Sequence, residues 1–425
     1  MTGGLMQLVA YGAQDIYLTG NPQITYFKVV YRRHTNFACE SIEQVFNGSA
    51  DFGKKVTCLV SRNGDLIKGV YFQATLPAVE SPSGSFRWVD DVGHHLIKEV
   101  ELEIGGQRID RQTGDWLQIW SELTVASGHT TGYRKMIGHY DICDSTGIIN
   151  DLSLQCYSTD AKDEATIYVP LQFWFCRNVG LSLPLIALQY HEVKINMTLR
   201  RSTEVAMAAA DDNEGLTLGD ASLWVDYVYL DTDERRRFAQ VSHEYLIEQV
   251  QHTGEESLSS SGTTLDEHLK LNYNHPVKEL VWVVQHNNVA DALQWSNYTT
   301  VKANDDDECR NPLGAANPVS TAKLQLNGHD RFATRNGTYF NWVQCFEHHT
   351  NIPESPGINV YSFALKPQEH QPSGSCNFSR IDNATLVLSV DFSTIGTVNA
   401  KVRVYAVNYN VLRIMSGMGG LAYSN

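Results

Sequence analysis

The sequence predicts an all-β protein made of two tandem eight-stranded antiparallel jelly rolls with short helices in the loops. Three observations carry this prediction: apolar residues alternate with period two, turn-forming residues separate the alternating runs, and sequence blocks recur about two hundred residues apart. A chain of 425 residues is also longer than one hydrophobic core usually fills. Two domains are therefore expected.

The strand prediction depends on runs in which every second side chain is apolar. Clear examples are "EVELEI" (99–104), "VKINMTL" (193–199) and "LVLSVDF" (386–392). Because successive side chains of a strand point to opposite faces, each run places its apolar residues on one face. Gly, Pro, Asn and Ser cluster between such runs, which is typical of half-buried antiparallel strands joined by turns.

Helical signals are few. Asn21 and Pro22 suit the N-cap and first position of a helix, and the residues that follow form an apolar stripe at Ile24, Phe27 and Tyr31. A second helix is predicted in "RQTGDWLQIWSEL" (111–123), whose stripe consists of Trp116, Trp120 and Leu123. Both helices are expected to decorate the β framework.

Four blocks recur in the same order along the chain. "IEQV" at 42–45 returns at 247–250, and "LIKGVYF" (66–72) resembles "PVKELVW" (276–282). "LEIGGQR" followed by "WLQIW" (102–120) resembles "LQLNGHD" followed by "YFNWV" (324–343), and Tyr168 precedes Val193 by the same 25 positions as Tyr361 precedes Leu386. Four ordered matches with offsets of 205, 210, 222 and 193 indicate a duplicated domain.

Changes in the offset show where one copy is longer than the other. The later copy gains twelve residues in the polar segment 286–320, and the earlier copy is longer by 29 from about Thr124 to Lys162. Such differences belong in surface loops. The seam between copies falls near "LDTDERRRFAQ" (230–240), a short linker helix with acids first and bases last. The expected divisions are an arm (1–25), a first roll (26–232), a second roll (233–415) and a tail (416–425).

Composition excludes several classes of function. Lys and Arg number 33 against 48 Asp and Glu, a net charge of -15, which argues against a protein that coats nucleic acid. The eight cysteines form no C-x-x-C pair, so zinc ribbons and thioredoxin-like sites have no support and reduced, mostly buried thiols are expected. The N-terminal stretch lacks a basic region and a long apolar run, so synthesis in the cytosol is predicted.

One segment, residues 361–390, raises the question of catalysis. Its sequence, "YSFALKPQEHQPSGSCNFSRIDNATLVLSV", gathers side chains that can form a nucleophile, its base and supporting groups: Glu369, His370, Cys376, Ser379 and Arg380. The alternative is a structural loop. We favour the loop, because its counterpart in the first copy, "QFWFCRNVGLSLPLIALQ" (172–189), lacks a matching set of His, Ser and Glu.

The composition of that segment fits a structural role. Pro367 and Pro372 fix the backbone, Gly374 permits an unusual turn, and the polar side chains are able to satisfy backbone groups. Cys376 is accordingly not predicted to be a nucleophile.

Other candidate sites are weaker. Glu101 and Glu103 point the same way from one strand, as a pair of glycosidase carboxylates must, but they occupy what reads as a solvated face. "NDDDEC" (304–309) lacks the spacing and glycine of a calcium loop. The adjacent pairs His94/His95 and His348/His349 would face opposite ways on a strand, so neither pair chelates a metal alone. We predict no catalytic, cofactor-binding or metal-binding residues, and no cofactor.

The last predicted strand contains a change of phase. In "KVRVYAVNYNV" (401–411) the apolar set runs through Val402, Val404 and Ala406 and then shifts to Val407, Tyr409 and Val411. One face cannot remain buried across such a shift. The strand must therefore bend, bulge or pass between two environments.

The terminal and central segments closely resemble one known family. "GGLMQLVAYGAQDIYLTGNPQITYFKVVYRRHTNFA" (3–38), "LWVDYVYLDTDERRRFAQ" (223–240), the 361–386 segment and "NVLRIMSGMGGLAYSN" (410–425) resemble the major capsid protein of nucleocytoplasmic large DNA viruses, including large algal and amoebal viruses. The resemblance reaches both ends of the chain. It implies a double jelly roll that forms homotrimeric, pseudo-hexagonal capsomers, which tile an icosahedral virion shell around an internal membrane.

The same resemblance implies partners. Capsomers contact each other, and their underside faces minor capsid proteins and the inner membrane, with no direct nucleic-acid binding. Residues 400–425 hold Lys401, Arg403 and Arg413 without an acid, and residues 1–38 hold three bases, Lys28, Arg32 and Arg33, against Asp15. These basic ends either lie on that underside or form plain solvated faces.

A function of another class stays open at this point. Lectins and some enzymes also use the jelly roll, so the alternative is a carbohydrate-binding or glycan-hydrolysing protein. That alternative requires paired carboxylates across a cleft, which no motif of the sequence supplies. A non-enzymatic capsid protein is the favoured interpretation.

Overall fold

The computed structural model describes residues 3–29, 31–80, 84–138, 161–208, 213–291, 293–301 and 315–423. The chain divides into two compact units, Met1–Asn36 and Phe37–Asn425. The predicted loop "NDDDEC" (304–309) and most of the loop expected between Thr124 and Lys162 lie outside the described residues. No described helix is long and apolar enough to cross a membrane.

The N-terminal unit holds two short helices, α1 (Gly3–Val9) and α2 (Ile16–Thr19), and none of its described residues is buried. The helix predicted from Asn21 onward is wrong. Asn21 adopts φ 49°, and residues 22–25 have no regular structure. Because a short helix is marginal in water unless its apolar stripe is buried, favourable end residues do not suffice here.

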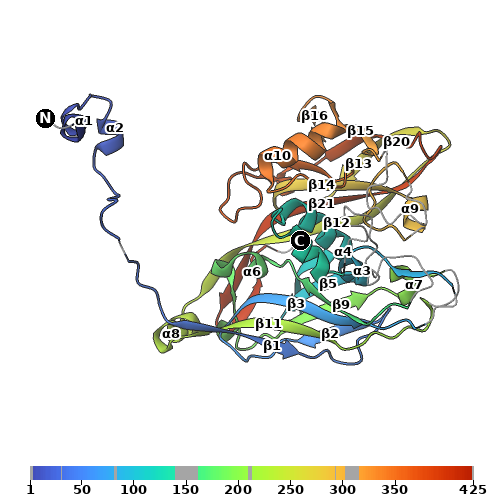
Figure 1. The fold of residues 1–425 in the computed structure, drawn as a ribbon, viewed down its shortest axis with the longest axis horizontal. Coiled ribbons are helices and arrows are strands. Elements are labelled where there is room, and N and C mark those ends of the chain that lie inside the picture. Colours follow the sequence, from blue (N-terminus) through green and yellow to red (C-terminus); the bar gives the residue numbers. More distant parts are fainter. Residues whose placement is uncertain are drawn as a thin grey trace. The chain divides into compact units, whose positions relative to one another are not determined.

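The first jelly roll consists of a five-stranded and a four-stranded antiparallel sheet. Figure 1 shows how these strands are arranged. The first sheet has the order β1 (Phe37–Gln44), β11 (Ala221–Leu230), β3 (Leu66–Leu76), β7 (Ala165–Pro170), and β8 (Leu183–Pro184) also pairs with β3. The second has the order β2 (Lys55–Leu59), β9 (Val193–Leu199), β5 (Ile97–Ile104), β6 (Gln107–Thr113), and β4 (Phe86–Trp88) forms a separate ribbon with β10 (Ala206–Ala208). The helices are α3 (Val92–Leu96), α4 (Gly114–Thr124), α5 (Thr130–Met136), α6 (Trp174–Arg177) and α7 (Ser202–Val205), with 3₁₀ turns η1 (Val179–Leu181) and η2 (Leu185–Ala187).

The second jelly roll repeats this plan. Its first sheet has the order β12 (His243–Ser260), β21 (Val398–Met415), β14 (Pro276–His286), β18 (Asn359–Ser362), with β19 (Cys376–Asn377) on β14 and β22 (Met418–Leu421) on β21. Its second has the order β13 (Thr264–Leu271), β20 (Ala384–Asp391), β15 (Val319–Leu326), β16 (His329–Asp330), with β17 (Arg335–Asn336) on β15. The helical segments are α9 (Asn287–Asp291), the π-helical η4 (Tyr339–Val343), α10 (Gln344–His348) and the 3₁₀ turn η5 (Phe378–Arg380).

The identical order of strands confirms the duplication and the all-β, double jelly-roll class. Two of the four sequence matches are equivalent in the sheets. In the first roll Ile67 pairs with Leu183, and in the second Val277 pairs with Cys376, so an offset of 210 relates β3 to β14. The glycine turns at Gly106 and Gly328, both with positive φ, join equivalent strands at the predicted offset of 222.

The other two matches are displaced. When β3 and β14 are aligned at the offset of 210, the strand pairings on each side make Ile42 of β1 equivalent to Gln251 of β12. This is an offset of 209, so the two "IEQV" strings, at an offset of 205, lie four residues out of register. Ile195 is likewise equivalent to Leu386, which gives 191 in place of 193. Short strings of common residues recur by chance, whereas backbone pairing fixes the register.

Two of the predicted helices are present. Helix α4 starts where Thr113 accepts a hydrogen bond from the Trp116 N–H, and it contains the residues of the predicted stripe. Helix α8 (Thr232–Gln240) joins the rolls; Asp231 caps it, its acids lie in the first turn and Arg237 lies in the last. Charges placed in this order stabilise the helix through their interaction with the helix dipole.

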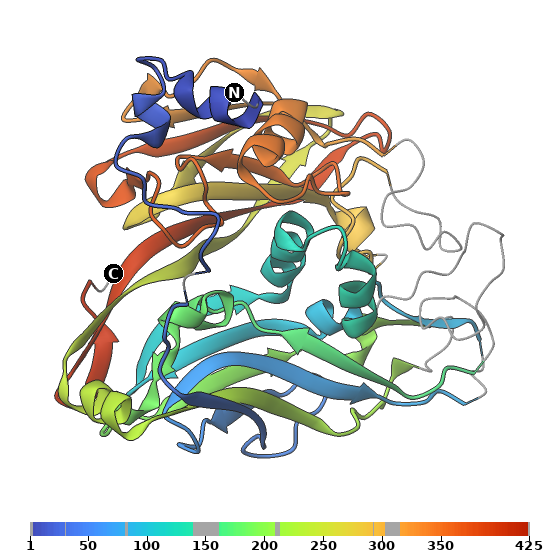
Figure 2. The same ribbon diagram turned by 60° about the vertical axis from the view of Figure 1, so that its left-hand side comes forward.

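The final long strand, β21, confirms the predicted change of phase. Val402, Val404 and Ala406 belong to the core of the second roll, whereas Leu412 and Ile414 belong to the core of the first. The pairing register with β14 shifts between Val277 and Glu279, opposite the point where the apolar phase changes. One strand therefore serves both cores, as the red ribbon of Figure 2 shows.

Candidate functional site

The 366–380 loop lies on the second roll, and its polar groups serve the backbone. The Ser379 hydroxyl accepts a hydrogen bond from the His275 N–H at 2.8 Å, and Glu369 pairs with Lys366 at 2.9 Å on the surface. Gly374 adopts φ 139°, where a Cβ atom would lie 2.8 Å from the Phe363 carbonyl oxygen. This close approach is what requires glycine.

Cys376 is placed as a strand residue. It pairs with Val277 of β14, and burial raises the pKa of its thiol, an effect that nearby Arg331 only partly offsets. A raised pKa reduces the thiolate fraction that a nucleophile needs. His370 and Arg380 flank this strand, at the start of the loop and in η5.

Gln368, which the sequence analysis did not single out, joins this loop to the first roll by hydrogen bonds. Gln368 donates from Nε2 to the Leu123 carbonyl oxygen of α4 at 2.9 Å, and its Oε1 accepts from Thr350. Asn351 also donates to the α4 end, through its backbone N–H to Leu123 and its side chain to Val125. The loop therefore holds the C-terminal end of a helix from the other roll, a connection that only the folded chain reveals.

The side chains of each histidine pair diverge as predicted, but neither pair lies on a strand: His94 and His95 belong to α3, His348 ends α10 and His349 is its C-cap. His94 contacts Gln118 at 2.6 Å and Tyr133 at 2.9 Å, and His95 contacts Ser296 of the second roll at 2.7 Å. Burial lowers the pKa of His95 to about 3, outweighing the nearby Asp115. His95 is therefore a neutral buried residue at physiological pH.

His348 and His349 also diverge. Nδ1 of His348 lies 2.9 Å from the Leu365 carbonyl oxygen, whereas Nε2 of His349 lies 3.0 Å from a buried Glu279 oxygen. Burial by itself raises the pKa of Glu279, but His349, Lys278 and Arg177 together bring it below the usual value. No group of three or more potential metal ligands gathers among the residues described here.

Glu101 and Glu103 lie on β5 and are bound to neighbours. Glu101 is 3.1 Å from Arg108 and 3.8 Å from Lys55, and Glu103 accepts a hydrogen bond from Asn196 at 3.2 Å. The face is more covered than predicted, since the side chain of Glu101 is only 15% exposed. Both carboxylates thus take part in cross-strand contacts of the sheet.

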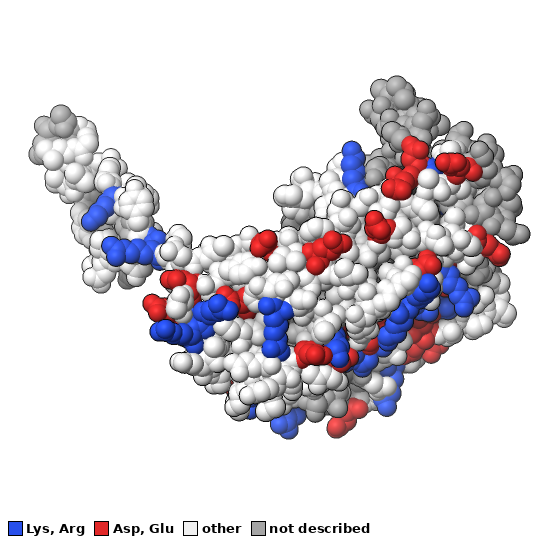
Figure 3. All heavy atoms as spheres, turned by 90° about the horizontal axis from the view of Figure 1, so that it is seen from below, with Lys and Arg blue, Asp and Glu red and all other residues white. Residues whose placement is uncertain are grey.

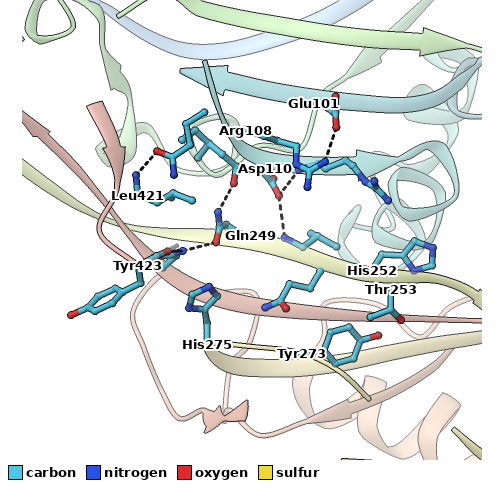
Figure 4. Close-up of a pocket in the computed structure, with 16 residues that line it drawn as sticks. Glu101, Arg108, Asp110, Gln249, His252, Thr253, Tyr273, His275, Leu421 and Tyr423 are labelled. Carbon is cyan, nitrogen blue, oxygen red and sulfur yellow. Dashed lines mark hydrogen bonds and ion pairs between the residues drawn. The ribbon is translucent and has the colours of Figure 1, made fainter. Parts of the chain in front are cut away.

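A polar groove of about 610 Å³ runs between the rolls (Figure 4). Strands β5 and β6 form one wall, and β12, the end of β21 and the C-terminal segment form the other. Within the second wall, Asn410 donates to Gln249 at 3.0 Å and to the Tyr423 carbonyl oxygen at 3.0 Å. The two walls are joined where the Leu421 N–H donates to Gln107 at 3.2 Å.

Asp110 lies at the floor of this groove. It accepts from the Val250 N–H of the other roll at 3.2 Å and from Gln112 at 2.9 Å. Burial raises the pKa of Asp110 to about 6, although these hydrogen bonds oppose the rise. Because Arg108 and Arg111 at the rim pair with Glu101 and Glu99, the charges of the groove compensate one another. The groove is a polar seam between the rolls.

Helix α4 lies between the two rolls (Figure 1) and supplies apolar side chains to the contact between them. Ile119, Trp120 and Leu123 pack with side chains of the second roll's first sheet, among them Val281 and Tyr405. The stripe was visible in the sequence. The sheet that packs on this stripe could not be identified from the sequence, because no sequence signal pairs one apolar face with another.

Buried charges surround this apolar contact. Asp115 of α4 lies 3.5 Å from Arg200 and 3.8 Å from Arg403 of β21, and Arg403 lies 2.8 Å from Glu255. Burial favours the neutral acid, but the two guanidinium groups lower the pKa of Asp115 to about 2. A second set joins Arg177, stacked over the Trp120 ring at 4.1 Å, to Glu248 at 3.1 Å.

Surface charge is mixed. On the face drawn in Figure 3, basic and acidic side chains are interspersed over the main unit. The three bases near the C-terminus are paired: Lys401 and Arg403 with Glu255, and Arg413 with Glu244. The basic C-terminal end expected from the sequence is therefore neutralised by acids of the preceding strand β12.

Two family profiles match the chain one after the other. Residues 25–231 match "Major capsid protein N-terminus", and residues 234–420 match "Large eukaryotic DNA virus major capsid protein". The "Major capsid protein" of Phaeocystis pouchetii virus is 51% identical and that of Pyramimonas orientalis virus 54% identical, each match covering 100% of both chains. This chain belongs to the family of large eukaryotic DNA virus major capsid proteins.

Solved structures of the family share the fold. A chain of the PBCV-1 virus capsid superposes with a TM-score of 0.78 at 39% identity, over 94% of this chain and all of the other. The Faustovirus major capsid protein gives a TM-score of 0.75 at 13% identity, over 97% and 96% of the two chains, a likeness of fold alone. Members of this family are structural proteins and not enzymes, so the contacts between the rolls are best understood as the internal framework of a capsid subunit.

Proposed function

We propose that three copies of this chain form a pseudo-hexagonal capsomer, and that many capsomers tile the icosahedral shell of a large DNA virus. One observation carries the proposal: two jelly rolls with the same strand order stand in one chain. Three such chains present six similar walls, so a threefold object fits a sixfold packing position. Full-length similarity to viral major capsid proteins supports the same conclusion.

The division of labour along the chain follows from this proposal. Residues 1–25 act as an arm, 26–232 and 233–415 as the two rolls, and 416–425 as a tail. In the N-terminal unit (Met1–Asn36), which includes the arm, exposed apolar residues such as Tyr17 and Phe27 accompany Lys28, Arg32 and Arg33. This composition supports contact with minor capsid proteins and the inner membrane on the underside of the shell.

We place synthesis in the host cytoplasm. The described cysteines are free thiols (Cys39, Cys58, Cys176, Cys345 and Cys376), which suits a reducing compartment. No cofactor and no catalytic residue form part of the proposal. The carbohydrate-binding or hydrolytic alternative is not pursued, because Glu101 and Glu103, its best candidates, are engaged in contacts of the sheet.

The test is the state of the purified protein. Sedimentation at micromolar concentration is expected to give a trimer, and electron microscopy is expected to give particles of hexagonal outline. A monomer in sedimentation together with glycan binding or hydrolysis would replace the capsid proposal by the alternative.

A further inference from the structure

The helical segment after the glycine turn occupies the same place in both rolls. After Gly106 it carries "WLQIW" (116–120), and after Gly328 it carries "YFNWV" (339–343). Within these strings Leu117 lies in the core of the first roll and Phe340 in the core of the second. The two segments, α4 and η4–α10, are therefore in the same register relative to their own sheets.

The positions that α4 buries are exposed in the second copy. Ile119, Trp120 and Leu123 lie buried between the rolls. Their equivalents are Trp342, Val343 and Phe346, with exposed fractions of 57%, 41% and 77%. Leu365, 73% exposed, adjoins them, because its carbonyl oxygen contacts His348 at the end of α10. Large apolar residues gathered in this way mark an interaction surface.

The surface that receives α4 also has an equivalent. Helix α4 covers the outer face of the β12-β21-β14-β18 sheet, where Val281, Tyr405 and Ile358 are buried. As a result β14 is buried on both faces, whereas β3, its equivalent, alternates between buried and half-buried residues.

The sheet register identifies the residues at these positions in the first roll. Val281 corresponds to Tyr71 at the offset of 210 that relates β3 to β14. Val281 pairs with Tyr405 and Tyr71 pairs with Trp224, so Tyr405 corresponds to Trp224. Tyr71 stacks on Trp224 with ring centroids 6.2 Å apart and an interplanar angle of 3°. Tyr168 of β7, 38% exposed, lies on the other side of Tyr71 at 6.4 Å. Tyr71 and Trp224 are half-buried and Tyr168 is exposed, so this row forms an aromatic platform on the outer face of the sheet.

We propose that η4–α10 of one copy packs on the aromatic platform (Tyr71, Tyr168 and Trp224) of a second copy. The contact repeats between chains the contact that α4 makes within a chain. This inference rests on the proposed trimer and names its interface. The two surfaces differ and lie on different rolls, so the contact is head-to-tail, and three copies of two rolls close it into a ring of six.

The test uses polar and charged substitutions on each surface. A helix variant carries Trp342→Asp and Phe346→Asp, and a platform variant carries Tyr71→Ser and Tyr168→Asp. The matched control is Leu59→Asp, an exposed apolar position on β2, in the opposite sheet of the first roll. Analytical ultracentrifugation measures assembly, and far-UV circular dichroism checks that each variant keeps the wild-type fold.

Each interface variant is expected to raise the protein concentration at half-assembly by about 100-fold, while the control assembles like the wild type. An equimolar mixture of the two variants retains one intact pair of surfaces, so it should form 1:1 dimers and no trimers. If both folded variants remain trimers, or if only one of them dissociates, the inferred interface is wrong. If the wild type itself is not a trimer, the proposed capsomer fails instead.

Discussion

Asp115 on α4 and Arg403 on β21 lie 3.8 Å apart across the boundary between the two jelly rolls, and both side chains are buried. Arg200 approaches the same carboxylate from the first roll at 3.5 Å. Burying one unpaired charge costs far more than an exposed charge does, so each member of this set depends on the others.

Replacing Asp115 by Asn is expected to lower the free energy of unfolding by about 3 kcal/mol, because two guanidinium groups lose their shared carboxylate. Urea unfolding of the purified protein measures this loss. The matched control is Glu369→Gln, which breaks the exposed pair with Lys366 and should cost less than about 1 kcal/mol. Equal losses in the two variants would contradict the role given to the buried cluster.

The same carboxylate predicts how stability depends on pH. The pKa of Asp115 is lowered from 3.8 to about 2 in the fold, so its contribution is present above pH 4 and is lost as the pH falls from about 4 towards 2. Unfolding free energy measured across this interval should fall more steeply for the wild type than for Asp115→Asn. Parallel curves would show that the carboxylate is not held ionised by its partners.

Leu123 and Phe346 occupy equivalent helical positions in different surroundings. Leu123→Ala should cost about 2–5 kcal/mol, since it opens a cavity between the rolls. Phe346→Ala should change the stability of dilute, unassembled protein by less than about 0.5 kcal/mol, because its side chain is exposed. Similar costs for both substitutions in urea unfolding would argue against this assignment.

Gly374→Ala is expected to destabilise the second roll by about 1–3 kcal/mol, because both its backbone angle and the nearby Phe363 carbonyl oxygen disfavour a Cβ atom. Gly48→Ala is the control: Gly48 has φ 99°, but no atom lies within 4 Å of the position that a Cβ would take there. The difference between the two melting temperatures isolates the steric part. No difference would mean that backbone angle alone matters.

His370→Ala combined with Cys376→Ala should leave capsomer assembly unchanged and remove no hydrolytic or transfer activity. Gln368→Ala, in the same loop, should lower the unfolding free energy by about 1 kcal/mol or more, because the Leu123 carbonyl oxygen loses a donor. Sedimentation and urea unfolding check the two halves of this prediction. A reaction abolished by the double variant in assembled protein would restore the catalytic interpretation of the loop.

Local patterns predicted the local elements well. Alternation found β5, β9 and β20, and the order of acids and bases found α8, since these signals depend on neighbours in the chain. The N-terminal unit shows the limit of such signals, because no helix forms after Asn21 and the predicted stripe of Ile24, Phe27 and Tyr31 is exposed. The "IEQV" match fails for a related reason: only pairing with Val225 and Ala406 reveals the true register.

The contact between the rolls could not be predicted from the sequence. The stripe of Trp116, Trp120 and Leu123 indicates an apolar surface, but the sheet that covers it comes from residues distant in the sequence, from Val250 to Val407. Nothing in the sequence around Gln368 indicates that its side chain donates a hydrogen bond to the Leu123 carbonyl oxygen in the folded chain. Tertiary partners of this kind depend on how layers stack, which no local period records.

Strand β21 has a mechanical consequence. It begins in the core of one roll and ends in the core of the other, with β12 bonded along most of its length. A load on either roll is therefore transmitted to the other through the hydrogen-bonded ladder of β12 and β21, whose register shifts between His252 and Glu255. Each chain should therefore respond to load as one rigid unit, so deformation of a shell built from such units should concentrate at the contacts between chains.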